Sequence, residues 1–218
     1  MSLSVPFPLI GLMGGTFDPI HHAHLRMAEE LATTLGLSEV RFIPAAIPPH
    51  RPQPGSSAAQ RADMVALAIE HNPRFTLDTR ELKREGYSYT VDSLQEIARE
   101  LAAEAGLCLL LGQDAFAGLP TWHRWQDLLK HAHIIVASRP GAQQVIESAD
   151  LTALIQQHEV KDVAALQNSK AGCIYFAHIT ALDISATKIR EQLSQGTSPR
   201  YLLPDTVLDY IQRHQLYS

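Results

Sequence analysis

The feature that most constrains the fold of this chain is a regular alternation of short apolar runs with longer amphipathic stretches. The apolar runs that we interpret as strands are residues 9–13, 40–44, 75–78, 108–112, 134–138 and 174–177. Several of them are almost continuously apolar, which is typical of strands covered by helices on both faces. The stretches with helical spacing of apolar residues are 23–35, 58–71, 91–105, 122–130, 185–195 and a last one from 204 to about 216.

This alternation predicts the fold class. Strands that alternate with helices pair in parallel through right-handed crossovers, so that helices cover both faces of the sheet. We therefore predict an α/β fold with a doubly wound, Rossmann-like parallel sheet in a single domain. Two segments depart from the pattern: residues 44–57 hold five prolines and predict a loop, and residues 141–171 are polar and helical without clear boundaries.

Length, charge and cysteine usage exclude several classes of protein. The 218 residues suffice for one α/β domain, and the formal charge of −5 argues against a surface that binds nucleic acid or anionic lipid. No apolar run approaches the roughly 20 residues of a membrane-spanning helix, and the first residues do not resemble a signal peptide. Cys108 and Cys173 lie in apolar runs, so we expect buried, reduced thiols. We expect a cytoplasmic protein without a nucleic-acid or membrane partner, either monomer or homodimer.

The stretch GLMGGTFDPIHHAHL, residues 11–25, crowds two glycines and three histidines where the first strand gives way to the first helix. Ligands bind at the carboxyl ends of strands in open α/β sheets. Gly14 and Gly15 allow close backbone approaches there, and the free N–H groups of the helix start favour an anion. His21 and His24 are three residues apart, hence on one helix face. Together they predict a phosphate-binding site.

Other interpretations of this stretch remain open at this point. A glycine turn before a helix, or a single histidine, is more often structural than functional. The two histidines could also bind a metal, with Asp18 as a third ligand, although neither cysteine is near in sequence. The stretch contains neither a phosphate-binding loop of the G-x-x-x-x-G-K-[ST] type nor the G-x-G-x-x-G dinucleotide fingerprint.

The segment GGTFDPIHHAHL resembles the signature of the nucleotidyltransferase superfamily with the [H/T]-x-G-H motif, and within it the bacterial nicotinate-nucleotide adenylyltransferases. The further segments that resemble this family are IPPHRPQP, FTLDTRELKREGYSYT, LLLGQDAF, LPTWHRW, VASRPG and ISATKIR. In order they cover most of the chain, and residues 143–172 match poorly. Ala23 stands where the motif has glycine, which adds a methyl group beside the expected phosphate pocket.

The resemblance implies one adenylyltransferase domain over residues 1–218 and a reaction that joins nicotinate mononucleotide to ATP. In this family the phosphate of the mononucleotide attacks directly, pyrophosphate leaves and no covalent enzyme intermediate forms. An ionised phosphate needs no general base, so the protein must position two anions and neutralise charge. Mg²⁺ is expected to be bound through the ATP phosphates, and the sequence shows no dedicated metal site.

The resemblance implies catalytic roles for three residues. His21 and His24 would contact the ATP phosphates, with His24 as the main stabiliser of the transition state. Arg190, in ISATKIR, would hold the β- and γ-phosphates. His22 is expected to be structural, and Ser185 is also well placed to cap a helix.

The substrate-binding residues that the resemblance implies are Gly14, Gly15, Thr16, Phe17, His50, Arg51, Thr90, Gly112, Asp114, Trp122, His123, Arg139 and Ser185. Asp114 would accept ribose hydroxyls, and Gly112 would leave room for the sugar or base. Trp122 would stack on the pyridine ring, while backbone N–H groups near Thr90 and His123 would receive the carboxylate. Donors placed there would select the acid over the amide.

Two positively charged regions complete the implied site. His50 and Arg51 lie in the proline-rich loop, which we interpret as a lid over the nucleotides. Arg139 follows the fifth expected strand and could contact a phosphate. The alternatives in function are adenylyl transfer to nicotinamide mononucleotide, phosphopantetheine or glycerol phosphate, and a non-catalytic nucleotide sensor. A tRNA-charging ligase is a weak alternative, because no second signature of the KMSKS type is present.

Overall fold

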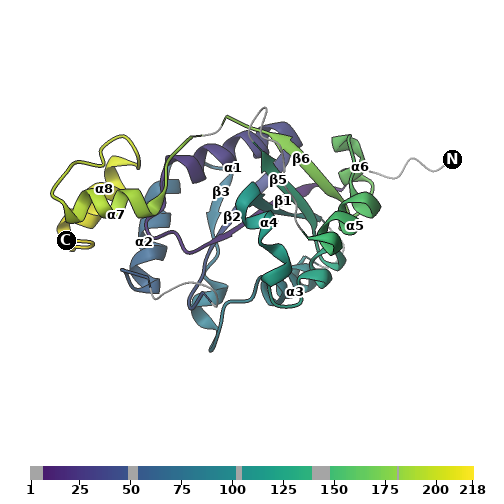
Figure 1. Ribbon diagram of the computed structural model, residues 1–218, viewed down its shortest axis with the longest axis horizontal. Helices are drawn as coiled ribbons and strands as arrows, with labels where there is room; N and C mark the ends of the chain where they lie inside the picture. The colour runs from purple at the N-terminus through teal and green to yellow at the C-terminus, as the bar shows by residue number, and fades with distance from the viewer. Residues whose placement is uncertain (1–6, 49–53, 102–104, 139–147, 181) are drawn as a thin grey trace.

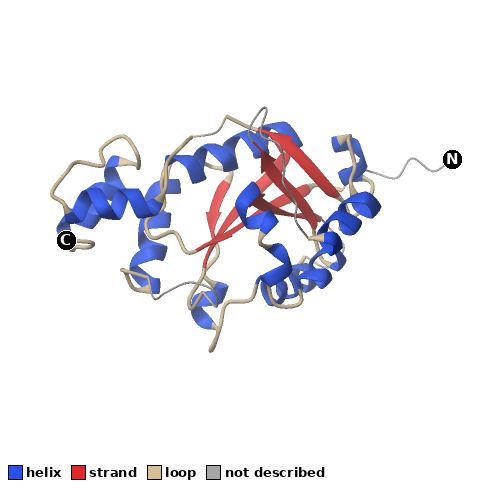
Figure 2. Ribbon diagram, viewed as in Figure 1, coloured by secondary structure: helices blue, strands red, loops and turns tan. Residues whose placement is uncertain are grey.

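The computed structural model describes residues 7–48, 54–101, 105–138, 148–180 and 182–218. It contains one six-stranded parallel sheet in the order β3-β2-β1-β4-β5-β6, with helices on both faces (Figures 1 and 2). The strands are β1 Leu9–Gly15, β2 Leu37–Pro44, β3 Phe75–Leu77, β4 Gly106–Gly112, β5 His133–Ser138 and β6 Ile174–His178. The predicted doubly wound sheet is confirmed.

Most of the helices lie in the connections between these strands, and two of them follow β6. The α-helices are α1 His22–Leu35, α2 Ala58–Ile69, α3 Thr90–Glu100, α4 Gln113–Ala117, α5 Ala149–His158, α6 Val163–Gln167, α7 Ala186–Ser194 and α8 Asp205–Arg213. The 3₁₀ helices are η1 Arg80–Lys83, η2 Leu119–Thr121 and η3 Trp125–Lys130. Among the described helices, none is both long and apolar enough to span a bilayer.

Two apolar cores stabilise the sheet, one on each face. Leu9 and Met13 of β1 point to the core formed with α1, α2 and α8, whereas Ile10 and Leu12 point to the core formed with α3, α4 and α5. This alternation follows from the two-residue period of a strand. Several strands are therefore nearly continuously apolar in sequence, because both of their faces are covered.

The sheet order creates a switch point between β1 and β4. From β1 the chain winds one way to β2 and β3, and the second half winds the other way through β5 and β6. β1 pairs with β2 as far as Gly15, but its pairing with β4 ends at Leu12 and Leu109. The carboxyl ends of β1 and β4 thus separate, and a crevice at this point is where open α/β sheets bind ligands.

The predicted helix over residues 122–130 is wrong in type and start. Pro120 lies in the short η2, Trp122 is extended, and Arg124 adopts a left-handed conformation with φ of 50°. These residues interrupt the α-helical hydrogen-bond ladder, so only the 3₁₀ helix η3 forms. The segment whose boundaries the sequence left open contains α5 and α6, which begin after the capping residues Ser148 and Asp162.

The remaining differences concern helix ends and one thiol. The third predicted helix, 91–105, ends as α3 at Glu100, and residues 102–104 lie outside the described part. The last helix stops at Arg213 rather than near 216. Cys108 is buried as expected, but Cys173 is only half-buried, and both thiols are free.

Candidate active site

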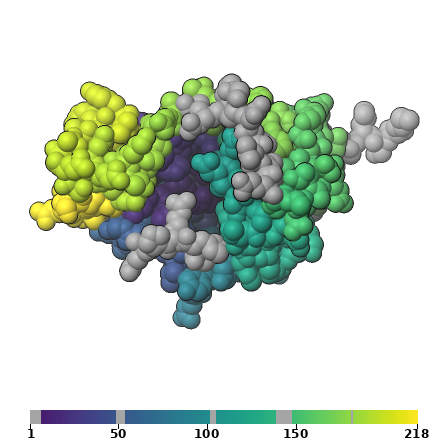
Figure 3. All heavy atoms as spheres, in the orientation of Figure 1, coloured from purple at the N-terminus to yellow at the C-terminus, as the bar shows by residue number. Residues whose placement is uncertain are grey.

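Three glycines lie where β1 and β4 separate. A Cβ added at Gly14 or Gly112 would meet no described atom within 4 Å, so open space adjoins both positions. A Cβ added at Gly15 would lie 3.0 Å from the ring of Phe17, inside the protein. Figure 3 shows that this face of the molecule is hollowed, with purple atoms of the N-terminal segment at the bottom. The yellow-green C-terminal segment borders the hollow on one side and the teal segment around β4 on the other.

His21 and His24 meet at the start of α1. His21 is the N-cap residue with an extended backbone, and its N–H donates to Nδ1 of His24 at 3.3 Å. The two rings stack with centroids 3.8 Å apart and an interplanar angle of 23°. The prediction that they share one helix face is confirmed. A helix N-terminus carries partial positive charge, so both rings lie where an anion is favoured.

His21 is a buried, neutral imidazole. Its exposed fraction is 5 %, and burial together with the neighbouring His22 lowers its pKa to about 4. Its Nδ1 atom has no hydrogen-bond partner among the described residues. Buried polar atoms in proteins are almost always paired, so this nitrogen is suited to a hydrogen bond with a bound ligand.

The loop between β1 and α1 is held from inside the protein. The ring of Phe17 is buried, lies edge-on to the His24 ring at 5.2 Å and packs against Phe42. The Phe17 side chain thus supports His24, and only its backbone remains as a possible contact for a substrate. The Thr16 carbonyl oxygen accepts a 2.7 Å hydrogen bond from Arg61.

Arg61 of α2 is a site-forming residue that sequence reasoning missed. Its side chain is buried to 99 % and donates to the carbonyl oxygens of Thr16, at 2.7 Å, and Ala46, at 3.1 Å. One guanidinium therefore ties together the carboxyl ends of β1 and β2. An arginine in an amphipathic helix is ordinarily expected to be exposed to solvent, so no local sequence pattern could have predicted this contact.

The helix α7 brings Arg190 to the same loop. The Arg190 guanidinium donates to the main-chain oxygen of Asp18 at 2.7 Å and lies 3.4 Å from the hydroxyl of Thr187. The hydroxyl of Ser185 accepts from the N–H of Lys188, which confirms its role as the helix N-cap. The side chain of Arg190 is one-third exposed, and its guanidinium lies beside the loop that leads into His21.

The residues expected around the pyridine ring come from two separate segments. The His123 ring lies 4.3 Å from the ring of Tyr89, which directly precedes Thr90 at the start of α3. Trp122 is half-buried against the apolar core, so part of its ring is accessible. Sequence reasoning missed Tyr89, although SYT belongs to a segment that resembled the family.

The side chain of Asp114 is exposed in the first turn of α4, two residues after Gly112, beside which space is open. Gly112 is the N-cap residue of α4, so the carboxylate of Asp114 is not the cap of this helix. The expected sites at His50, Arg51 and Arg139 lie outside the described residues.

Asp18 is occupied by protein donors rather than available to a metal. Its carboxylate accepts hydrogen bonds from the N–H of Gly55 and the hydroxyls of Ser56 and Tyr217. Within the described part of the chain, no three His, Cys, Asp or Glu side chains gather in a way that could hold a metal ion. A zinc site formed by His21, His24 and Asp18 is therefore not supported.

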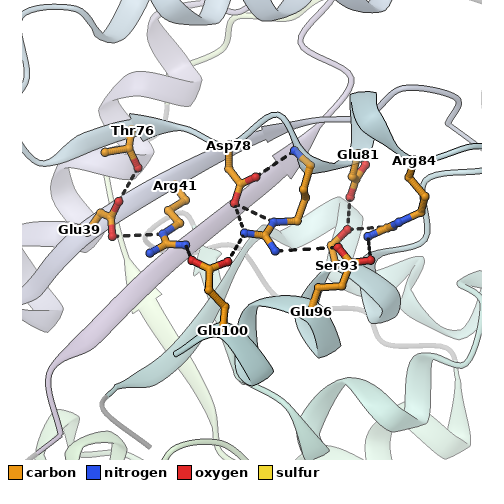
Figure 4. Close-up of polar contacts among 10 residues, drawn as sticks. Glu39, Arg41, Thr76, Asp78, Glu81, Arg84, Ser93, Glu96 and Glu100 are labelled. Carbon is orange, nitrogen blue, oxygen red and sulfur yellow. Dashed lines mark hydrogen bonds and ion pairs between the residues drawn. The ribbon is translucent and has the colours of Figure 1, made fainter. Parts of the chain in front are cut away.

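A second polar cluster lies on the β2–β3 edge, away from the switch point. Figure 4 shows a chain of charged side chains in which Arg41 and Arg80 both bind Glu100. A hollow of about 430 Å³ is lined partly by these residues. Arg80 also binds Asp78, and Glu81 accepts from the Ser93 hydroxyl at 2.6 Å. Because these charges are paired with one another, the cluster fixes η1 against α3.

Comparison with known proteins identifies the family of this chain. The model of the cytidylyltransferase-like family matches residues 12–192. A probable nicotinate-nucleotide adenylyltransferase of Dechloromonas aromatica is 51% identical over 210 residues, which cover 95% of this chain and 97% of that protein. The protein of the same name from Aeromonas hydrophila is 48% identical, with 96% and 97% covered.

A solved structure confirms the fold independently. The structure of Plasmodium falciparum nicotinic acid mononucleotide adenylyltransferase, complexed with NaAD, matches with a TM-score of 0.71 at 18% identity. The match covers 96% of this chain and 97% of that chain, and at this identity it supports the fold alone. From the sequence matches, the chain belongs to the cytidylyltransferase-like family and, within it, to the nicotinate-nucleotide adenylyltransferases.

Proposed function

We propose that the protein transfers the adenylyl group of ATP to nicotinate mononucleotide, giving nicotinate adenine dinucleotide and pyrophosphate, in NAD biosynthesis. The observation that carries this proposal is the stacked pair of His21 and His24 at the switch point, in a chain 51% identical over nearly its full length to a probable nicotinate-nucleotide adenylyltransferase. The protein is accordingly a nucleotidyltransferase.

The chemistry requires positioning more than proton transfer. A phosphate oxygen of the mononucleotide attacks the α-phosphorus of ATP, and the bond to the bridging oxygen breaks as pyrophosphate leaves with the electron pair. The attacking phosphate is already ionised, so the protein supplies orientation and positive charge. The backbone N–H groups at the start of α1, His24 and Arg190 are the groups that we assign to this task.

The hydrogen bond between His21 and His24 sets the tautomer of the second ring. Because Nδ1 of His24 accepts the His21 N–H, the neutral ring carries its hydrogen on Nε2. We assign this Nε2–H to the phosphate oxygens that gain charge in the transition state. His21 is neutral at pH 7 and is assigned a hydrogen bond to the same phosphates through its unpaired Nδ1.

We propose that Mg²⁺ enters with ATP, bound through the phosphates, where it offsets their charge. Among the described residues no three His, Cys, Asp or Glu side chains are placed to hold a metal ion, which is compatible with a metal held by the nucleotide. The other groups assigned to ATP are Gly14, Gly15, Thr16, Ser185, Gly112 and Asp114.

The preference for the acid would arise at Trp122, His123 and Thr90. We propose that the accessible part of Trp122 stacks on the pyridine ring and that N–H groups near Thr90 and His123 bind the carboxylate. The contact between the His123 and Tyr89 rings supports this assignment, because it holds the two segments together before substrate binds. An amide would place its own N–H donors against these donors.

We further propose a cytoplasmic enzyme that acts as a monomer or homodimer without nucleic-acid or membrane partners. The net charge of −5 supports this, because phosphate backbones and anionic lipids repel such a surface.

The experiment is product analysis by mass spectrometry after incubation with ATP, Mg²⁺ and nicotinate mononucleotide. The expected product is the deamido dinucleotide with one pyrophosphate per turnover, and nicotinamide mononucleotide should react more slowly. Equal rates with the acid and the amide would contradict the proposed specificity but support the proposed adenylyl transfer. Tight ATP binding without turnover of either substrate would favour the nucleotide sensor.

A further inference from the structure

The carboxylate of Asp18 is the centre of a buried hydrogen-bonded cluster that the proposed reaction does not explain. Asp18 is 6 % exposed and lies three residues before His21. Oδ2 accepts the N–H of Gly55 at 2.9 Å, and Oδ1 accepts the hydroxyls of Ser56 and Tyr217, each at 2.6 Å. All three donors are neutral, and they come from the residues just before α2 and from beyond the end of α8.

The Tyr217 side chain is built into this cluster rather than lying on its surface. A Cβ added at Gly55 would lie 3.1 Å from the Tyr217 ring, so the ring packs directly on the backbone there. Burial and the hydrogen bond to Asp18 raise the pKa of the Tyr217 hydroxyl well above its usual value. The hydroxyl therefore keeps its proton and remains a donor to the carboxylate.

Arg190 meets Asp18 in an unexpected way. Its guanidinium donates to the main-chain oxygen of Asp18 at 2.7 Å, whereas its distance to the carboxylate Oδ2 is 3.8 Å. A direct charged hydrogen bond between guanidinium and carboxylate would be shorter and stronger. The neutral donors on the carboxylate thus leave Arg190 bound to a carbonyl oxygen, with one-third of its side chain exposed.

Loss of the Tyr217 hydroxyl would leave the Asp18 carboxylate with one hydrogen-bond donor fewer and would change the position of Arg190. A buried carboxylate that loses a hydrogen bond needs another partner. Among the described residues, two arginines lie near this carboxylate. Arg61 is fully buried and held by two carbonyl oxygens, whereas Arg190 is partly exposed and about 1 Å beyond direct contact. Arg190 is therefore the one that can move.

We propose that Tyr217 is a positioning residue for adenylyl transfer: its hydroxyl occupies the Asp18 carboxylate and so keeps the Arg190 guanidinium available for the ATP phosphates. This inference rests on the proposed function, in which Arg190 binds the triphosphate. Tyr217 itself touches neither reacting group in this scheme. It acts through Asp18, across 199 residues of sequence.

The test compares Tyr217→Phe with Tyr210→Phe. Tyr210 is a matched control, because its hydroxyl, like that of Tyr217, donates to a carboxylate. Its acceptor is Asp63 of α2, at 2.8 Å, and this hydrogen bond lies on the outer surface. Calorimetric titration with Mg²⁺ and α,β-methylene ATP measures nucleotide affinity without turnover. We expect Tyr217→Phe to weaken this affinity about five- to tenfold, the value of one hydrogen bond, and Tyr210→Phe to leave it unchanged.

A double-mutant cycle separates positioning from general loosening of the fold. In an Arg190→Ala background, Tyr217→Phe should cause no further loss of nucleotide affinity, because the group it acts through is gone. The KM for nicotinate mononucleotide should change little in Tyr217→Phe. The same fold-loss in both backgrounds, or an equal loss in Tyr210→Phe, would overturn the proposal.

The outcomes also distinguish this inference from the proposed function. If wild-type protein binds the ATP analogue but makes no dinucleotide, the proposed function fails while the titrations still decide the role of Tyr217. If the dinucleotide forms and Tyr217→Phe binds the analogue like wild type, only the inference fails.

Discussion

At the scale of single residues, the site depends on a pair of stacked imidazoles, and burial lowers the pKa of one of them, His21. His21 is buried at the start of α1, and its pKa lies near 4. In the unfolded chain a histidine titrates near 6.5. Between these values the unfolded chain binds more protons than the folded protein, so stability must fall as pH falls through this window.

The predicted effect of His21 on stability is therefore specific in sign and range. The free energy of unfolding should decrease between about pH 6.5 and pH 4, with His21 contributing up to about 3 kcal/mol. His133, whose pKa is also lowered by burial, contributes in the same direction. Urea titrations at several pH values on wild type and His21→Asn would measure this, and an identical slope in both proteins would contradict it.

The two glycines of the motif should differ sharply in what a methyl group does. Gly14→Ala should leave the melting temperature unchanged but raise KM for ATP about tenfold or more, because its Cβ enters the open space where we place the phosphates. Gly15→Ala should instead lower the melting temperature, since its Cβ presses on Phe17 at 3.0 Å. Thermal melts with steady-state kinetics check both, and normal ATP kinetics in a stable Gly14→Ala protein would place the triphosphate elsewhere.

At the scale of elements, buried polar contacts fix the ends of β1 and β2. Arg61 from α2 supplies the donors for two main-chain oxygens at these ends. Arg61→Met keeps most of the apolar volume but leaves both part-buried carbonyl oxygens without this donor. We expect a loss of about 3 kcal/mol in the free energy of unfolding.

The matched control for Arg61→Met is Arg26→Met, in which an exposed i,i+4 pair with Glu30 is lost. Such a pair contributes about 0.5 kcal/mol or less. Both values are measured by urea denaturation. An effect of Arg61→Met no larger than that of Arg26→Met would mean that water replaces the guanidinium at little cost.

Local sequence patterns predicted most of the helices and strands but failed for one helix. The strands were predictable because strands buried on both faces are largely apolar. β2 begins at Leu37, three residues before its predicted start, because Ser38 and Glu39 interrupt the apolar run. Helix α1 and its histidine pair followed from a three-residue spacing. The prediction of a helix over residues 122–130 was wrong because Arg124 adopts a positive φ. Packing imposes this conformation, and the arginine in the sequence does not indicate it.

At the scale of the whole molecule, the sheet order places the site. β1 is central and borders the switch point, so the loop after it lies in the crevice between the two halves (Figure 1). The alternation of elements predicted a parallel sheet with crossovers, and hence that the motif lies at a carboxyl end. The contacts of Asp18 with Ser56 and Tyr217 were not predictable, because each joins residues distant in sequence through side chains with no periodic pattern.

For the molecule as a whole, we propose that adenylyl transfer takes place at the start of α1 and that His24 stabilises the charge that develops there. The most direct measurement is pyrophosphate release by His24→Ala with ATP and nicotinate mononucleotide, beside His22→Ala as the adjacent control. We expect kcat to fall about 10²- to 10³-fold in His24→Ala with little change in melting temperature, while His22→Ala stays within a few-fold of wild type. Pyrophosphate release at the wild-type rate in a folded His24→Ala protein would contradict the account.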